Sequence, residues 1–286
     1  MTSMTNVERD KKLDHAVAAH YKECEKKYGE GKVWVTMLYG SQNYGLDTPD
    51  SDVDTKTMLL PSVRDVVLGK QMVSTDLVMP DGALSNTKDF RAMFQNYLKG
   101  NINFVETLYT PWFACNERYY PFFQELRRHR DLIANSQPRR LAHMAAGMAN
   151  QKYVAFEKPF ESKKEVLSKY GYDPKQLHHL ARLRWFLHTY NAHMDFEFAL
   201  TPPRDKFDWL YSLKVDPLPY DKAKELKETL MSAINDEVAY ADSFLPEENK
   251  RQAAQDFMDD LTVRLFNEMF WNGLVSDSFD LSKLEI

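Results

Sequence analysis

The chain has 286 residues, enough for about two domains of ordinary size and for a sizeable hydrophobic core. Hydrophobic residues make up 43% of it and charged residues 28%, with 10 glycines and 13 prolines, a composition that excludes disordered and collagen-like proteins. Because 37 lysines and arginines face 42 aspartates and glutamates, the net charge is -5, which argues against a protein that coats duplex DNA. The net charge does not exclude a local basic strip on part of the surface.

The cysteines and the N-terminal segment indicate the cellular compartment. Cys24 and Cys115 lie far apart in the chain, a spacing that fits neither a zinc site nor a disulfide framework. The N-terminal segment carries charges where a secretory signal needs an apolar stretch, and no apolar run reaches the ~18 residues of a membrane span. We therefore expect a reduced, soluble, cytoplasmic protein with no membrane partner.

In chain order, the first part of the sequence alternates helical and strand patterns. The apolar spacing, the β-branched runs and the turn residues define its elements. The expected elements are a helix over 10–28, a buried strand over 33–39, a strand that begins at Asp52, a short helix over 62–70, a strand over 71–79, a brief extended segment at 83–85, a helix capped by Ser85 or Asn86 that ends near 99–101, and another buried element over 101–113.

From about residue 119 onward, helical periodicity replaces the strand patterns. Helices are expected over 124–133, 138–156, 163–171, 173–194, 221–240 and 252–271. No constant period links them, so this half is a helical domain and not a solenoid. We predict an α+β architecture, with a small mixed sheet and flanking helices in a first domain over 1–118 and an all-helical domain over 119–286.

The segment over 39–56 carries the clearest chemical pattern. Gly40 and Ser41 directly follow a buried strand, and Asp52 and Asp54 stand one residue apart on the next, where a period of two places them on the same face. Such close carboxylates repel each other unless a divalent cation lies between them, and oxygen ligands suit Mg²⁺ or Mn²⁺ better than zinc. At Gly40 the backbone can approach a ligand, and the N–H and hydroxyl of Ser41 can hold phosphate oxygens.

This pattern, Gly-Ser followed after ten residues by Asp-x-Asp, resembles the DNA polymerase β-like nucleotidyltransferase superfamily. Within it, GSQNYGLDTPDSDVD is similar to the motif Gly-Ser-x-x-Tyr-Gly-x-x-Thr-x-x-Ser-Asp-x-Asp of predicted bacterial and phage nucleotidyltransferases. Two later stretches, KGNINFVETLYTP and YDPKQLHHLARL, are similar to that family's Gly-Asn-Pro-Asn…Glu-Leu-Leu and Tyr-Asp-x-Lys…His-x-x-Arg-Leu stretches. The resemblance covers roughly residues 33–190.

The resemblance implies a palm-like sheet, a cleft closed by the helical domain, and transfer of a nucleoside monophosphate from a nucleoside triphosphate to a hydroxyl acceptor with release of pyrophosphate. It implies that Asp52 and Asp54, with a third acid, are catalytic and hold two Mg²⁺ or Mn²⁺ ions. Counting back from the following helix selects Asp81 as the third acid. Asp76 is the alternative because it lies within the predicted strand over 71–79. Asp89 and Glu106 are the next choices for the third acid.

The resemblance also assigns nucleotide contacts to Gly40, Ser41, Lys175, His179 and Arg182. The last three share one helix face and form a basic stripe that fits a triphosphate or a nucleic-acid acceptor, with helix packing as the alternative. Basic clusters at 127–130 and 139–140, together with Lys152, could grip RNA or be solvated helix faces.

Two classes of function remain open at this stage. The first is an active enzyme whose acceptor is an RNA 3′ end, a protein hydroxyl or a small molecule. The second is a catalytically reduced member that senses nucleotides or binds a partner as an antitoxin does. The intact Gly40, Ser41, Asp52 and Asp54 favour the first class. The oligomeric state is not predicted.

Overall fold

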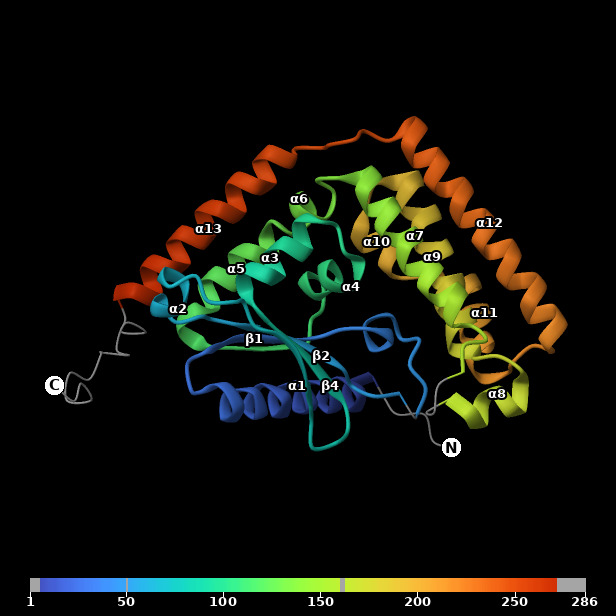
Figure 1. Ribbon diagram of the computed structural model, residues 1–286, viewed down its shortest axis with the longest axis horizontal. Helices are drawn as coiled ribbons and strands as arrows, with labels where there is room; N and C mark the ends of the chain where they lie inside the picture. Colours follow the sequence, from blue (N-terminus) through green and yellow to red (C-terminus); the bar gives the residue numbers. More distant parts are fainter. Residues whose placement is uncertain (1–5, 50, 160–162, 272–286) are drawn as a thin grey trace.

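The computed structural model describes residues 6–49, 51–159 and 163–271, which form a five-stranded mixed sheet with helices packed around it (Figure 1). This confirms the expected α+β class. The strands are β1 (Val33–Leu38), β2 (Thr55–Leu59), β3 (Ser74–Val78), β4 (Leu84–Asp89) and β5 (Phe113–Cys115). They lie in the order β3-β4-β2-β1-β5. β2 and β4 are parallel, and every other neighbouring pair is antiparallel.

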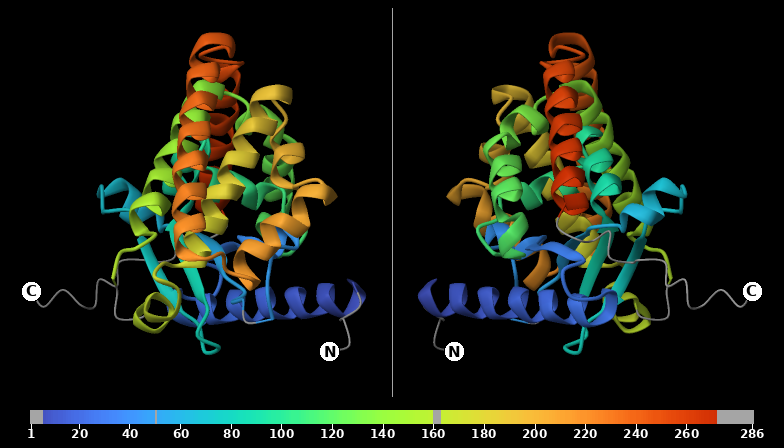
Figure 2. Two further views of the ribbon diagram at one scale, coloured as in Figure 1. Left: turned by 90° about the vertical axis from the view of Figure 1, so that its right-hand side faces the viewer. Right: turned by 90° about the vertical axis from the view of Figure 1, so that its left-hand side faces the viewer.

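The helices of the first half cover both faces of the sheet. They are α1 (Asn6–Tyr28), η1 (Ser41–Tyr44), α2 (Val63–Val67), α3 (Phe90–Leu98), α4 (Ile102–Val105), η2 (Glu106–Leu108) and η3 (Glu117–Tyr119), where η denotes a 3-10 helix. α1 runs along one face of the sheet, and the other helices lie on the opposite side (Figure 2). No helix in the described part of the chain combines the length and the apolar character that a bilayer crossing requires.

The helices of the second half are α5 (Tyr120–Arg128), α6 (Arg130–Ala134), α7 (Pro138–Ala155), α8 (Lys164–Tyr170), α9 (Pro174–His193), α10 (Phe196–Leu200), α11 (Arg204–Val215), α12 (Tyr220–Phe244) and α13 (Arg251–Trp271). Five of the six predicted helical stretches are confirmed, the stretch predicted over 124–133 is divided at His129 between α5 and α6, and α10 and α11 are additional. α7, α9 and α12 pack on one another, with α10 and α11 against α9. Although α5, α6 and α13 follow residue 118, they lie with α3 on the sheet side (Figure 1).

The two faces of the sheet differ in chemistry. Toward α1, the hydroxyls of Thr36, Thr57 and Ser85 form a chain with O···O distances of 2.8 Å, and the thiol of Cys24 lies over it. Toward α3, large aromatic side chains interlock instead. In this layer the ring of Trp34 on β1 lies 5.9 Å from that of Phe90 and 6.0 Å from that of Phe94.

The predicted start of the helix that ends near residue 99 is wrong, and the reason is non-local. The segment 84–89 is not a brief extension before a helix capped by Ser85 or Asn86, because it forms β4 and pairs in parallel with β2. α3 therefore begins only at Phe90. Its first turn is capped by Asp89, which accepts the N–H of Arg91 at 2.9 Å.

Phe90 joins the sheet, α3 and α13. Its ring lies 5.9 Å from the ring of Trp34 on β1 and 5.4 Å from that of Phe266 on α13, and it is fully buried. We expect Phe90→Ala to lower the free energy of unfolding by about 3 to 5 kcal/mol because it leaves a cavity among these rings. Urea unfolding measures this loss. The control Phe244→Ala removes a ring that is 72% exposed and should change it by less than about 0.5 kcal/mol. Equal losses in both variants would contradict the packing described.

Candidate active site

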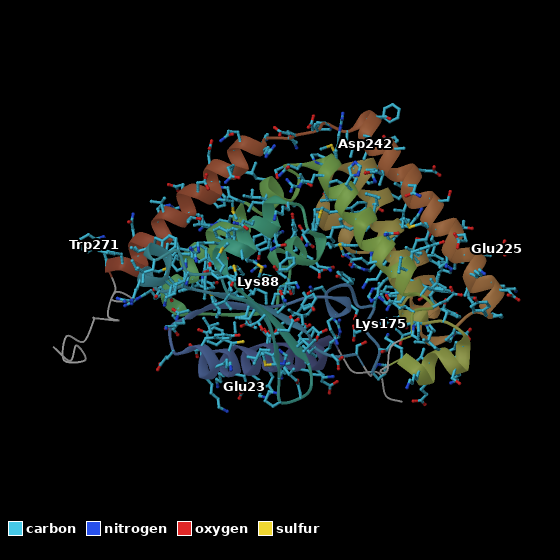
Figure 3. All side chains as sticks on the ribbon, in the orientation of Figure 1. Glu23, Lys88, Lys175, Glu225, Asp242 and Trp271 are labelled. Carbon is cyan, nitrogen blue, oxygen red and sulfur yellow. The ribbon has the colours of Figure 1, made fainter. Side chains whose placement is uncertain are left out.

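A cleft of about 510 Å³ lies between the sheet and the group of helices formed by α7 and α9 to α12, which we call the helical layer. The sheet side contributes Tyr39 directly after β1, residues of the loop segments 40–49 and 51–54, and residues of α4 and η2. The helical side contributes residues of α7, α9 and α11 together with Lys163. In Figure 3, Lys175 lies between these two parts of the molecule. The cleft therefore joins segments that are far apart in the sequence.

The turn after β1 is built around a glycine. Gly40 has φ 88° and ψ -156°, a backbone region that is essentially restricted to glycine. Side-chain bonds hold the residues that follow: the Asn43 amide donates to the carbonyl of Leu38 at 3.3 Å and accepts the hydroxyl of Thr110 at 2.7 Å. Gly40 and Ser41, both predicted to bind nucleotide, thus line the cleft on a fixed turn.

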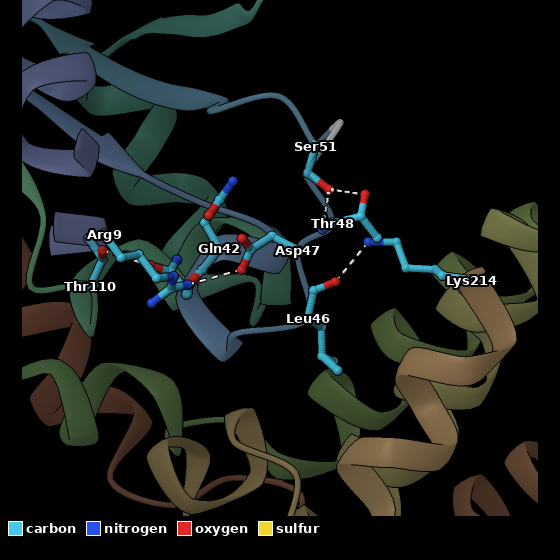
Figure 4. Close-up of polar contacts among 9 residues, drawn as sticks. Arg9, Gln42, Leu46, Asp47, Thr48, Ser51, Thr110 and Lys214 are labelled. Atoms are coloured by element: carbon cyan, nitrogen blue, oxygen red, sulfur yellow. Dashed lines mark hydrogen bonds and ion pairs between the residues drawn. The ribbon is translucent and has the colours of Figure 1, made fainter. Parts of the chain in front are cut away.

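The loop that returns to the aspartates is clamped from two sides (Figure 4). Arg9 of α1 donates to the carbonyl of Gln42 at 2.6 Å and to the carboxylate of Asp47 at 3.0 Å. Lys214 of α11 donates to the carbonyl of Leu46 at 2.7 Å. The loop is therefore bonded both to the helix beneath the sheet and to the helical layer.

Asp52 and Asp54 both line the cleft, but they precede the strand instead of lying on it. β2 begins at Thr55, so the prediction of a strand from Asp52 is wrong by three residues. Asp52 is exposed, whereas Asp54 is half-buried and accepts the N–H of Leu84 at 3.0 Å. That bond ties Asp54 to the start of β4.

The structure does not bring the expected third acid to this pair. Asp81 lies in the turn between β3 and β4, where it accepts the N–H of Ala83 at 3.0 Å and lies 3.4 Å from His20 of α1, on the opposite side of the sheet. Asp76 is exposed on the edge strand β3 and accepts the amide of Asn86 at 2.7 Å. β4 separates β3 from β2, so Asp76 is two strand spacings, about 9.5 Å, from the strand that follows Asp54.

Glu106 is the third carboxylate that lines the cleft, and its oxygens are already engaged. It is 1% exposed, accepts the N–H of Gly40 at 3.1 Å through one oxygen and accepts the hydroxyl of Tyr44 through the other. Burial raises the pKa of Glu106, and the charge of Arg182 opposes that rise. Across residues 6–49, 51–159 and 163–271, no three His, Cys, Asp or Glu side chains converge as a metal-binding group.

The helical side of the cleft is cationic. Among its basic groups, Lys163 is paired with Asp173, and Arg182 lies over the ring of Tyr44 at 4.4 Å. The ammonium groups of Lys152 and Lys175 have no hydrogen-bonding or ion-pair partner within the described residues. Burial, followed by repulsion from Lys175, lowers the pKa of Lys152. A cleft with two unpaired ammonium groups attracts an anion.

The histidines of α9 do not add charge to this wall. Burial lowers the pKa of His178 to about 4, and its Nδ1 lies 2.8 Å from the carbonyl of Leu210. Burial, reinforced by His178 and by Lys152, also holds the pKa of His179 well below its usual range. His179 therefore lines the cleft as a neutral imidazole at physiological pH, able to hydrogen-bond but not to form an ion pair.

The structure separates the predicted basic groups. The helical spacing of Lys175, His179 and Arg182 does bring all three to the cleft. Lys152 joins them there, whereas Arg127 and Arg139, which the sequence grouped with it as RNA contacts, donate to the backbone carbonyls of Leu108, Thr110 and Leu245. Sequence reasoning missed Lys163 and Lys214, because no local pattern places them beside the loop.

A buried lysine lies next to the acids. Lys56 of β2 is 4% exposed, with its ammonium 3.8 Å from the ring centre of Tyr39 and 4.3 Å from that of Phe104. Burial lowers its pKa from 10.5 to about 8, with attraction to Glu106 opposing the shift and repulsion by Lys88 adding to it. Lys56 thus loses its proton more readily in the folded chain than in the unfolded one.

This difference predicts a pH dependence of stability. Between pH 8 and 10.5 the unfolded chain holds more protons at Lys56 than the folded chain, so the destabilising effect of burying Lys56 becomes smaller as the pH rises. We expect the free energy of unfolding of the wild type, measured relative to Lys56→Met, to rise by about 2 kcal/mol from pH 7 to pH 10. Urea unfolding of both proteins at the two pH values measures it. A constant difference between them would contradict the shifted pKa.

Comparison with known protein families finds no matching family model, and comparison with curated proteins finds no match by sequence. The function is therefore argued from the cleft and from the residue pattern that it gathers.

Proposed function

We propose that the protein is a metal-dependent nucleotidyltransferase, which transfers a nucleoside monophosphate from a nucleoside triphosphate to a hydroxyl acceptor and releases pyrophosphate. One observation carries the proposal. A single cleft is lined by the turn at Gly40 and Ser41, by Asp52 and Asp54, and by the unpaired Lys152 and Lys175 of the helical layer. An anion grip and a carboxylate pair then face the same space.

The charges of the cleft match those of a triphosphate. Lys152 and Lys175 offer two ammonium groups without a partner in the described part of the chain, so binding a phosphate there breaks no existing ion pair. The hydroxyl of Ser41, on the facing side, can donate to a phosphate oxygen. Arg182 is less free because it lies over Tyr44, 4.4 Å from the ring centre, and beside Glu106.

Asp52 and Asp54 fit a divalent cation by their chemistry. They offer hard oxygen ligands at the edge of the cleft, the donor type that Mg²⁺ and Mn²⁺ prefer. When bound, such a cation neutralises phosphate charge and polarises the phosphoryl group. The pair alone accounts for one ion, since Asp81 and Asp76 lie elsewhere. Binding of a second ion is not supported by a third carboxylate in the described ranges.

The proposed reaction forms a bond from the acceptor oxygen to the α-phosphorus and breaks the bond from that phosphorus to pyrophosphate. The acceptor hydroxyl gives up its proton as the new bond forms. Asp52 is exposed at the cleft and has no hydrogen-bond partner in the described residues, so its carboxylate is available to take that proton. An RNA 3′ end, a protein hydroxyl and a small molecule are the candidate acceptors.

A second candidate function has one observation in its favour. Because no third carboxylate joins Asp52 and Asp54 as a metal-binding group in the described residues, and Glu106 is bonded to Gly40 and Tyr44, the cleft also suits a protein that binds nucleotide without transferring it. Such a protein would be a nucleotide sensor or a partner-binding subunit, such as an antitoxin. Binding and transfer must therefore be measured separately.

The transfer test uses the purified chain with Mg²⁺ or Mn²⁺, each α-labelled nucleoside triphosphate, and RNA, protein extract or small metabolites as separate acceptors. We expect label to move onto one acceptor class, and Asp52→Asn or Asp54→Asn to reduce the rate at least about a hundredfold, since each removes a carboxylate charge from the site. Nucleotide binding without transfer to any acceptor would favour the sensor. Transfer that survives in both variants would contradict the assigned site.

The grip on phosphate is tested by binding alone. We expect Lys175→Gln and Lys152→Gln each to weaken nucleoside triphosphate binding about tenfold, the loss of about 1.4 kcal/mol of charge attraction. Titration calorimetry measures the affinity. Lys26→Gln is the matched control because its side chain is 79% exposed on α1, which packs on the far side of the sheet. Equal affinities in the wild type and in all three variants would contradict binding of the triphosphate by Lys152 and Lys175.

A further inference from the structure

We propose that Glu106 and Tyr44 are positioning residues, which hold the turn at Gly40 and Ser41 in the shape that receives phosphate. The inference rests on the proposed function, because it assigns how that site is kept ready for its ligand. It also gives Glu106 a different role from that of a third acid in a metal site.

The contacts of Glu106 reach both ends of the turn. One carboxylate oxygen accepts the N–H of Gly40, the first residue of the turn, at 3.1 Å, and the other accepts the hydroxyl of Tyr44, its last helical residue. Glu106 belongs to η2, which follows α4 and lies outside the turn itself. A single buried carboxylate thus fixes the separation of the two ends of the turn from a separate element.

The conformation of Gly40 makes this anchoring necessary. Its φ of 88° and ψ of -156° lie in a sparsely populated backbone region that persists only where surrounding contacts hold it. The N–H of Gly40 is part-buried and donates to Glu106, so leaving it without an acceptor would be costly. The bond to Glu106 therefore favours this turn over relaxed alternatives that would redirect the backbone at Ser41.

The same carboxylate balances charge across the cleft. Arg182 of α9 is 7% exposed and lies 4.4 Å from the ring centre of Tyr44, and its charge is the strongest one acting on Glu106. Lys56 of β2 is the next basic charge. A buried carboxylate is tolerated when it is compensated in this way. Glu106 compensates the charges of Arg182 and Lys56. In the described lining, Lys152 and Lys175 therefore carry the positive charge that remains uncompensated.

Two readouts separate positioning from general stability. Amide hydrogen exchange of residues 40–46 reports the order of the turn without any ligand, and titration with nucleoside triphosphate and Mg²⁺ reports the affinity of the cleft for phosphate.

Three variants and one control are compared with the wild type. Tyr44→Phe keeps the ring under Arg182 but removes the hydroxyl. Glu106→Gln keeps an acceptor for Gly40 N–H, whereas Glu106→Ala removes both bonds. Tyr97→Phe is the matched control, since Tyr97 is fully buried and its hydroxyl lies 3.0 Å from that of Thr107, outside the cleft lining.

We expect Tyr44→Phe and Glu106→Ala to speed exchange in the turn at least tenfold and to weaken nucleotide binding about tenfold. Glu106→Gln should lose less than Glu106→Ala in both measurements. Tyr97→Phe should keep wild-type exchange in the turn and wild-type affinity, even where its melting temperature falls as far as that of Tyr44→Phe.

Wild-type exchange in the turn of Tyr44→Phe and Glu106→Ala would overturn the proposal. So would altered exchange in the turn with nucleotide affinity unchanged, because the turn would then not set the grip. If the wild type bound no nucleotide, the proposed function itself would fail, and the exchange data would still show whether Glu106 and Tyr44 order the turn. The two failures are therefore distinguishable.

Discussion

The arrangement of the cleft depends on a buried chain of contacts in which Arg182 lies over the ring of Tyr44 and Tyr44 donates its hydroxyl to Glu106. The three side chains come from α9, from the turn after β1 and from η2, so this contact joins the helical layer to the sheet side where the two meet. An arginine and a glutamate buried this deeply are tolerated because each compensates the other. The lysines of α7 and α9 consequently face the aspartates across an open space.

Local patterns in the sequence were sufficient for much of this arrangement. The strand that ends at Gly40 and the helix that carries Lys175 and Arg182 depend on residues close together in the chain, and both were predicted. The start of α3 was not. Ser85 and Asn86 have the chemistry of helix caps, but parallel pairing with β2 extends the strand through Asp89. A cap is a local property, whereas a strand partner is not.

The prediction of the third acid is wrong, and the prediction of the cleft cations is incomplete, for a related reason. Asp81 is selected by counting back from the helix start at Lys88-Asp89-Phe90, where α3 does begin, but a count along the chain does not tell which side of the sheet a turn residue reaches. The turn between β3 and β4 then carries Asp81 to the α1 side, next to His20. Lys214 reaches the loop carbonyl of Leu46 from a helix far along the chain. Only the packing of α11 on α9 could place it there.

The return of α13 to the sheet side makes the helical layer an insertion with two attachments. The chain enters the layer after α6 and leaves it through the segment between α12 and α13, and these two crossings lie side by side. Asn249 N–H donates to the carbonyl of Ser136 at 2.8 Å, and Arg139 donates to the carbonyl of Leu245 at 2.8 Å. Because the two crossings are bonded to each other, two chain segments attach the helical layer to the sheet side at one place, and a change in either segment would act on both.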